Sequence, residues 1–129
     1  MSQSSKTNVQ FFPADRADAP YSTAVRVGNL LFLSGMLGTD SSGQLAKGGI
    51  GPETKQTMEN IRAALQRYGS SFDHVVKVTV MLADIGEWQA MNDVYLTFFS
   101  THKPARSAFG ASGLARNGRV EIECVAVIP

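Results

Sequence analysis

The alternation of apolar and polar side chains predicts short strands along most of the chain. Residues 76–82 alternate strictly, the pattern of a strand with one buried face. The pattern of residues 25–34 predicts two short strands around Gly28-Asn29, a dipeptide suited to a tight hairpin. We expect residues 105–111 and 119–128 to form a final strand pair with 113–118 as the turn, and residues 8–12 to be a further strand.

Two segments have helical spacing instead. Met58, Ile61, Leu65 and Tyr68 recur on one helical face, with Pro52 at the first helical position and Gly69 as the stop. The preceding stretch, 38–51, holds five glycines and is predicted to be a surface loop.

The second helix places four large apolar side chains on one face. Asp84 and Glu87 before it form a candidate capping box, in which side chains accept from the unpaired N–H groups of the first turn. The four apolar residues are Trp88, Met91, Tyr95 and Phe98.

The resulting order is β-β-α-β-α-β-β, which predicts an α+β fold with two helices over one face of a mixed sheet. No repeat or linker interrupts the sequence, so we expect one domain over residues 1–129.

The last strand has apolar residues on both faces. Val125 and Val127 share one face with Glu121 and Glu123, opposite the apolar series from Val120 to Ile128. Apolar residues on the face away from the helices favour a second subunit that covers it, although isolated valines in water are also common.

Composition narrows the function. Twelve Lys and Arg against eleven Asp and Glu give a formal charge of +1, which does not favour nucleic-acid binding. One cysteine rules out an internal disulfide, and no Cys/His cluster has zinc spacing, so no metal site is predicted. The polar start and the lack of a long apolar segment predict no membrane association and a cytoplasmic location.

Two charged residues are candidates for chemistry. Arg106, at the start of an apolar strand, has the fork geometry to hold a small carboxylate, but could equally pair with Glu121 or Glu123 or point into solvent. Glu121 and Glu123 share a strand face. Either could be an acid–base group if burial raises its pKa, or a solvated charge.

The remaining candidates are weaker taken singly. Tyr21 and Ser34 bracket the first hairpin and could bind a ligand or satisfy nearby backbone, and Asn92 lies among apolar residues of the second helix. Cys124 alternates with apolar neighbours and is predicted to pack as a small hydrophobe.

Together these pieces resemble the RidA (YjgF) family of enamine/imine deaminases. The resemblance runs, in family order, over almost the whole chain. It rests on Ala19-Pro20-Tyr21-Ser22, Ser34-Gly35, Asn92-Asp93-Val94-Tyr95, Pro104-Ala105-Arg106-Ser107 and Val120-Glu121-Ile122-Glu123.

The resemblance implies a chorismate-mutase-like fold, a homotrimer with an inner β-barrel, and active sites between subunits. It also implies hydrolysis of 2-imino acids, such as the tautomer of 2-aminoacrylate, to 2-keto acids and ammonia, without cofactor or metal. Arg106 would bind the substrate carboxylate and Glu121 would activate water. Tyr21, Ser34 and Asn92 would line the cleft.

Two positions depart from the family, and alternatives remain open. Ala108 replaces a frequent cysteine, and Ala115 replaces a frequent proline. A sibling deaminase acting on 2-aminomuconate or on the aminoacrylate of pyrimidine breakdown would share these motifs. A non-catalytic or regulatory trimer that binds small carboxylates would share them too. Ribonuclease activity, attributed to some relatives, is not favoured by the charge or the histidines.

Overall fold

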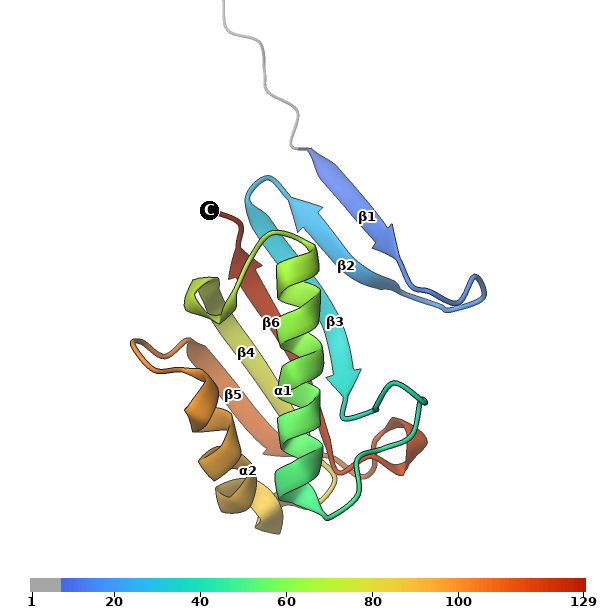
Figure 1. Cartoon of the computed structure of the whole chain (residues 1–129), viewed down its shortest axis with the longest axis vertical. Coiled ribbons are helices and arrows are strands. Elements are labelled where there is room, and N and C mark those ends of the chain that lie inside the picture. The colour runs from blue at the N-terminus through green and yellow to red at the C-terminus, as the bar shows by residue number, and fades with distance from the viewer. Residues whose placement is uncertain (1–7) are drawn as a thin grey trace, which may run out of the picture.

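The segments predicted as strands pair into one six-stranded mixed sheet in the computed structural model, which describes residues 8–129 (Figure 1). Two helices, α1 and α2, cover one face of the sheet, as the pattern predicted. The elements are β1 (Val9–Pro13), β2 (Ser22–Val27), β3 (Leu30–Leu37), α1 (Ile50–Arg67), β4 (Val75–Leu82), α2 (Trp88–Tyr95), β5 (Ala105–Gly110) and β6 (Val120–Val127).

The strand order is β1-β2-β3-β6-β4-β5, which corrects one prediction. β5 and β6 are not a hairpin pair, because β4 lies between them. β5 pairs in parallel with β4 at the sheet edge, and β6 is antiparallel to both β3 and β4. Residues 111–119 therefore carry the chain from an edge to the middle of the sheet rather than around a tight turn.

The hairpin between β2 and β3 forms where Gly28-Asn29 predicted it. Val27 pairs with Leu30, and Gly28 has a φ of 58°, a backbone region that glycine enters without steric cost. This turn places Ser22 and Ser34 on adjacent strands.

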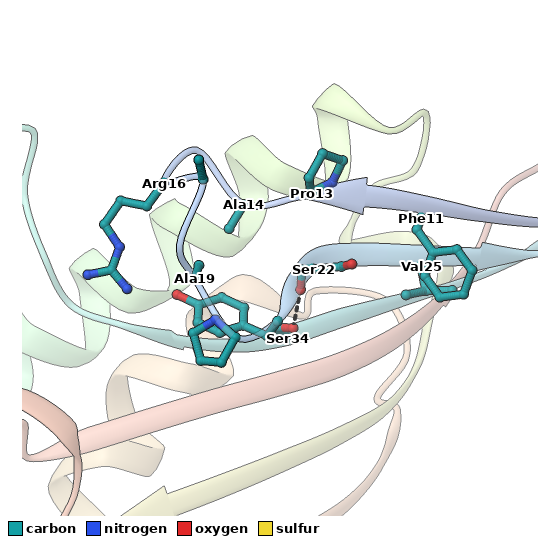
Figure 2. Close-up of a pocket in the computed structure, with 11 residues that line it drawn as sticks. Phe11, Pro13, Ala14, Arg16, Ala19, Ser22, Val25 and Ser34 are labelled. Atoms are coloured by element: carbon teal, nitrogen blue, oxygen red, sulfur yellow. Dashed lines mark hydrogen bonds between the residues drawn. The ribbon is translucent and has the colours of Figure 1, made fainter.

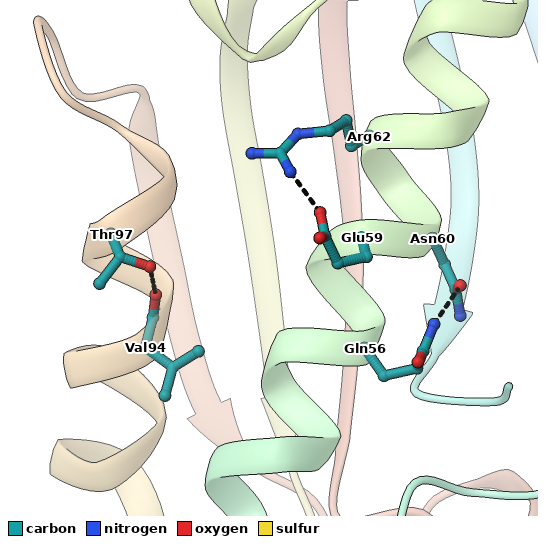
Figure 3. Close-up of polar contacts among 6 residues, drawn as sticks. All are labelled: Gln56, Glu59, Asn60, Arg62, Val94 and Thr97. Carbon is teal, nitrogen blue, oxygen red and sulfur yellow. Dashed lines mark hydrogen bonds and ion pairs between the residues drawn. The ribbon is translucent and has the colours of Figure 1, made fainter.

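Helix α1 begins at Ile50, two residues before the predicted Pro52, and ends at Arg67, close to the predicted stop at Gly69. Its inner face forms the core with β3, β4 and β6. Its polar contacts lie on opposite flanks of the helix, where Gln56 bonds Asn60 and Glu59 pairs with Arg62 (Figure 3).

Asn60 also fixes the chain that leaves β3. Its Nδ2 donates to the carbonyl oxygens of Leu37 (3.0 Å) and Thr39 (2.8 Å). The end of β3 is thereby fixed to α1, and this end of the strand borders the hollow described below.

The capping box before α2 is only partly present. Asp84 accepts from the backbone N–H of Gly86 at 2.8 Å and caps a 3₁₀ turn (Ile85–Glu87), but the Glu87 carboxylate pairs with Arg119 at 2.9 Å. The expected apolar face of α2 is confirmed: Met91 and Tyr95 are buried, and Trp88 and Phe98 pack against the core.

The face of the sheet away from the helices, called the open face below, carries apolar rows. Phe11, Val25, Phe32 and Val125 are partners in register across β1, β2, β3 and β6. Phe11 is 66% exposed and Phe32 is 40% exposed, so this face is an uncovered apolar surface.

β4 departs from strict alternation at its start. A register shift between Val75 and Lys77 leaves Val75 buried and Val76 exposed, so Val76 does not share the buried face predicted for it. Neither helix is long and apolar enough to cross a membrane within the residues described.

Candidate active site

Three of the predicted site residues gather in one hollow on the open face. Tyr21, Ser34 and Glu121 all line it, and its volume is about 710 Å³. Glu121 lies in β6 opposite Leu37 of β3 and Met81 of β4. The carboxylate is therefore flanked by apolar side chains beside two hydroxyl groups.

The Glu121 carboxylate packs directly on the backbone of Gly35. A Cβ at position 35 would lie 2.2 Å from Oε2 of Glu121, closer than any ordinary contact. Only glycine therefore leaves room for the carboxylate in this position, which explains the glycine of the Ser-Gly pair within β3.

Ser34 donates its hydroxyl proton to another group of the same chain. Its Oγ donates to the carbonyl oxygen of Ser22 at 2.5 Å, the bond drawn in Figure 2. The oxygen therefore faces the hollow as an acceptor. Tyr21 is 56% exposed, and it also lines an adjoining hollow of about 610 Å³ between Phe11 and Ser34 (Figure 2).

Ala115 and Arg116 form part of the rim of the hollow. Arg116 and Asn117 both adopt a left-handed backbone, with φ of 58° and 59°, and Arg116 donates to the carbonyl oxygen of Gly43 at 2.7 Å. Ala115, at the position of the frequent family proline, lines the hollow. This departure therefore lies on the rim of the candidate site.

A buried carboxylate holds this rim from below. Glu53 of α1 is only 3% exposed, and its Oε2 accepts from the backbone N–H of Arg119 at 2.6 Å. The contact fixes the start of β6, two residues before Glu121, against the first turn of α1.

Arg106 lies elsewhere, on the helix side of the sheet. It pairs in register with the buried Val78 and is half-buried beside α2. Its Nη1 donates to Oδ1 of Asn92 at 2.6 Å. Its guanidinium carbon lies 5.3 Å from the ring centre of Trp88 and 4.8 Å from that of Tyr95.

Arg106 forms no ion pair with any residue in the described range. The alternative that it pairs with Glu121 or Glu123 is therefore wrong for the isolated chain. A half-buried guanidinium without a carboxylate partner is a candidate site for an external anion.

Arg106 and Glu121 thus project from opposite faces of the same sheet. Neither Arg106 nor Asn92 lines the hollow that contains Glu121. The structure gathers Tyr21, Ser34 and Glu121 in one place and Arg106 and Asn92 in another, so Asn92 supports the arginine and does not line the Glu121 hollow.

Cys124 is buried in the core, as predicted. Burial raises the pKa of its thiol to about 12, with a smaller contribution from Glu123. A thiol that stays protonated at neutral pH is a poor nucleophile. Ala108, which replaces the frequent family cysteine, lies two residues after Arg106 and packs against the core.

Two kinds of residue at these two places were not among the predicted site residues. Gly35 is visible in the Ser-Gly motif, but its close approach to Glu121 is a contact between distant strands. Trp88 and Tyr95 were interpreted only as core residues. Their spacing from Asn92, four and three residues, is the signal that places all three on one helical stripe.

The sequence is similar to those of known proteins over most of its length. The sequence model of a family described as endoribonuclease L-PSP matches residues 13–128. A goat (Capra hircus) protein named 2-iminobutanoate/2-iminopropanoate deaminase is 48% identical over 115 residues, which cover 88% of this chain and 84% of the goat protein. The human protein of the same name is 43% identical over the same shares.

Solved structures agree on the fold. The crystal structure of RidA from the Antarctic bacterium Psychrobacter sp. PAMC 21119 superposes with a TM-score of 0.82 at 35% identity. The superposition covers 95% of this chain and all of the other.

Proposed function

The chain belongs to the endoribonuclease L-PSP family, also called the RidA or YjgF family, and from this premise we propose that it is a 2-iminobutanoate/2-iminopropanoate-type deaminase. It hydrolyses reactive 2-imino acids, including the tautomer of 2-aminoacrylate, to 2-keto acids and ammonia. The observation that carries the proposal is the half-buried cation of Arg106, which has a hydrogen-bond acceptor in Asn92 but no carboxylate partner in the described chain.

The reaction needs an anchor, a positioned water and a proton carrier. Arg106 can hold the substrate carboxylate through two parallel N–H···O bonds. Glu121 accepts a proton from water as the water oxygen bonds to the imine carbon. Glu121 then returns that proton to the nitrogen. The hydroxyl proton of the resulting carbinolamine then passes through Glu121 to the same nitrogen as the C=O bond forms and the C–N bond breaks, so ammonia leaves and Glu121 ends in its starting state.

The hollow around Glu121 suits this chemistry. Ser34, whose proton is committed to Ser22, can accept a hydrogen bond from the water or from the imine nitrogen. Tyr21 lines the same hollow and can donate from its hydroxyl. Positioning these groups around a bound imine replaces a bimolecular encounter, and orientation of this kind lowers barriers by several kcal/mol.

The active site is proposed to lie between two copies of the chain. Arg106 and Glu121 project from opposite faces of one sheet, so the two groups of one copy cannot close on one small substrate. The helix side of β5 in one copy must approach the open face of another. The exposed row containing Phe11 and Phe32 supports assembly of several copies, because a homotrimer with its open faces inward, forming an inner barrel, would bury this row.

The test is competition for imine in solution. An amino acid oxidase generates 2-imino acids in situ, semicarbazide traps them, and a deaminase slows semicarbazone formation. Wild-type protein should divert imine from the trap. Arg106→Ala should lower kcat/KM by roughly 10²-fold or more, because it removes a bidentate, charge-assisted contact.

Glu121→Gln separates binding from chemistry. It should keep affinity for a 2-keto acid and slow turnover by roughly 10²–10⁴-fold. Wild-type turnover in a correctly assembled Arg106→Ala variant would rule out the carboxylate anchor. RNA cleavage that follows the purified protein and survives Arg106→Ala would instead favour the activity named in the family description.

A further inference from the structure

Helix α2 presents one stripe of side chains to Arg106. Trp88, Asn92 and Tyr95 are spaced i, i+4 and i+7, so they lie one above another on the same helical face. All three contact the guanidinium: Asn92 accepts a hydrogen bond at 2.6 Å, and the two ring centres lie 5.3 and 4.8 Å from its central carbon. We call these three residues the arginine cradle.

The cradle holds the cation without neutralising it. A guanidinium has five N–H donors, and within the described residues only one hydrogen bond leaves this side chain, to Asn92. Aromatic faces attract a cation through their ring quadrupole and consume neither its charge nor its donors. A glutamate in the same place would hold Arg106 equally firmly but would compete with a bound carboxylate.

Tyr95 remains a neutral ring in this setting. Its hydroxyl is buried beside the Arg106 guanidinium and makes no hydrogen bond of ordinary geometry within the described chain. Burial raises the pKa of this phenol to about 12, against a smaller opposing influence from Arg106. No phenolate therefore forms near neutral pH to pair with the guanidinium.

We propose that Trp88 and Tyr95 are positioning residues for the carboxylate anchor. Their ring faces fix the plane of the Arg106 guanidinium so that its free N–H groups are aimed at the substrate before it binds. The inference rests on the proposed function for the identity of the anion, whereas the fixing of Arg106 can be measured in the free protein.

Trp88 is the better residue to test. It is only partly buried and packs against the edge of the core, whereas Tyr95 is 3% exposed within it. Replacing Trp88 therefore removes a ring face with less risk to the fold. Trp88→Leu removes the aromatic face, and Trp88→Phe is the matched variant that keeps one.

The first experiment measures imine turnover and the binding of 2-oxobutanoate, a keto-acid product, in wild type, Trp88→Leu and Trp88→Phe. Trp88→Leu should raise KM and the Kd of 2-oxobutanoate by roughly 2- to 30-fold, the range of one cation–π contact, with little change in kcat. Trp88→Phe should recover most of the loss. A merely structural role would lower kcat through a smaller active fraction and leave KM unchanged.

Wild-type KM and Kd in an assembled Trp88→Leu protein would overturn the proposal. A wild-type protein that binds 2-oxobutanoate but hydrolyses no imine would refute the proposed reaction, while the Kd comparison would still decide the role of Trp88.

If Trp88→Leu does not assemble, or if the wild-type protein binds no keto acid, a second measurement tests the proposal. The Nε–H resonance of Arg106, assigned by its loss in Arg106→Lys, should be shifted by the rings in wild type and should move in Trp88→Phe. A resonance at the position of a free arginine in both proteins would overturn the proposal.

Discussion

Replacing Gly35, which contacts the Glu121 carboxylate, should lower activity while leaving stability nearly unchanged. In Gly35→Ala the added Cβ would lie 2.2 Å from Oε2, 3.0 Å from Cδ and 3.2 Å from Cγ of Glu121. Gly35 has no positive φ in the structure, so alanine fits the backbone. The three nearest atoms therefore all belong to one flexible side chain, that of Glu121.

The size of the clash sets the expected effect. Restoring an ordinary contact requires the carboxylate to move by about 1 Å, and a misplacement of that size can cost roughly 10²-fold in rate. We expect kcat to fall by about 10- to 100-fold while the free energy of unfolding changes by less than about 1 kcal/mol. Affinity for 2-oxobutanoate should be nearly unchanged, because Arg106 is not disturbed.

Alanine variants of two other glycines serve as controls. At Gly38 a Cβ would lie 2.4 Å from the backbone oxygen of Glu53, which cannot turn away, so Gly38→Ala should lower the melting temperature clearly. At Gly113 a Cβ would meet nothing within 4 Å, so Gly113→Ala should match wild type. The assays are imine diversion and thermal unfolding. Wild-type kcat in Gly35→Ala would refute the argument that the observed carboxylate position is the reactive one.

Two further predictions concern buried groups. Glu53→Ala leaves the Arg119 N–H without its acceptor and should lower the free energy of unfolding by about 1–3 kcal/mol. Glu53→Gln keeps an acceptor oxygen and should lower it less. Equal losses of stability in denaturant titrations of the two variants would contradict this role of Glu53. Cys124 should react with iodoacetamide only after unfolding. Because its folded pKa is raised to about 12 from the ordinary 9, the unfolded thiol ionises first, so stability should fall between pH 9 and 12, and less steeply in Cys124→Ala.

The secondary structure could be predicted from the sequence because it follows local pattern. Alternation located the strands, and helical spacing located α1 and α2 to within a few residues. The pairing of β5 could not be predicted in this way. Residues 113–118 have the composition of a hairpin turn, but whether they join neighbouring strands depends on where β4 lies in the sheet, which no local pattern records.

The site could be predicted residue by residue but not as an arrangement. The alternation in β6 places Glu121 opposite the buried Val120 and Ile122. In β5, Ala108 and Phe109 lie on opposite faces and both are apolar, so the pattern does not show which face Arg106 lies on. Its position on the helix side became clear only with its contacts to Asn92 and to the two rings.

The central claim is that Arg106 of one copy and Glu121 of another form one active site, and subunit mixing tests it directly. Arg106→Ala and Glu121→Gln, each nearly inactive alone, are co-expressed in equal amounts so that mixed oligomers form. A site is intact only where both contributing copies carry the right residue, so about one quarter of wild-type activity should return. Mixed oligomers that stay as inactive as the parent variants would contradict the account.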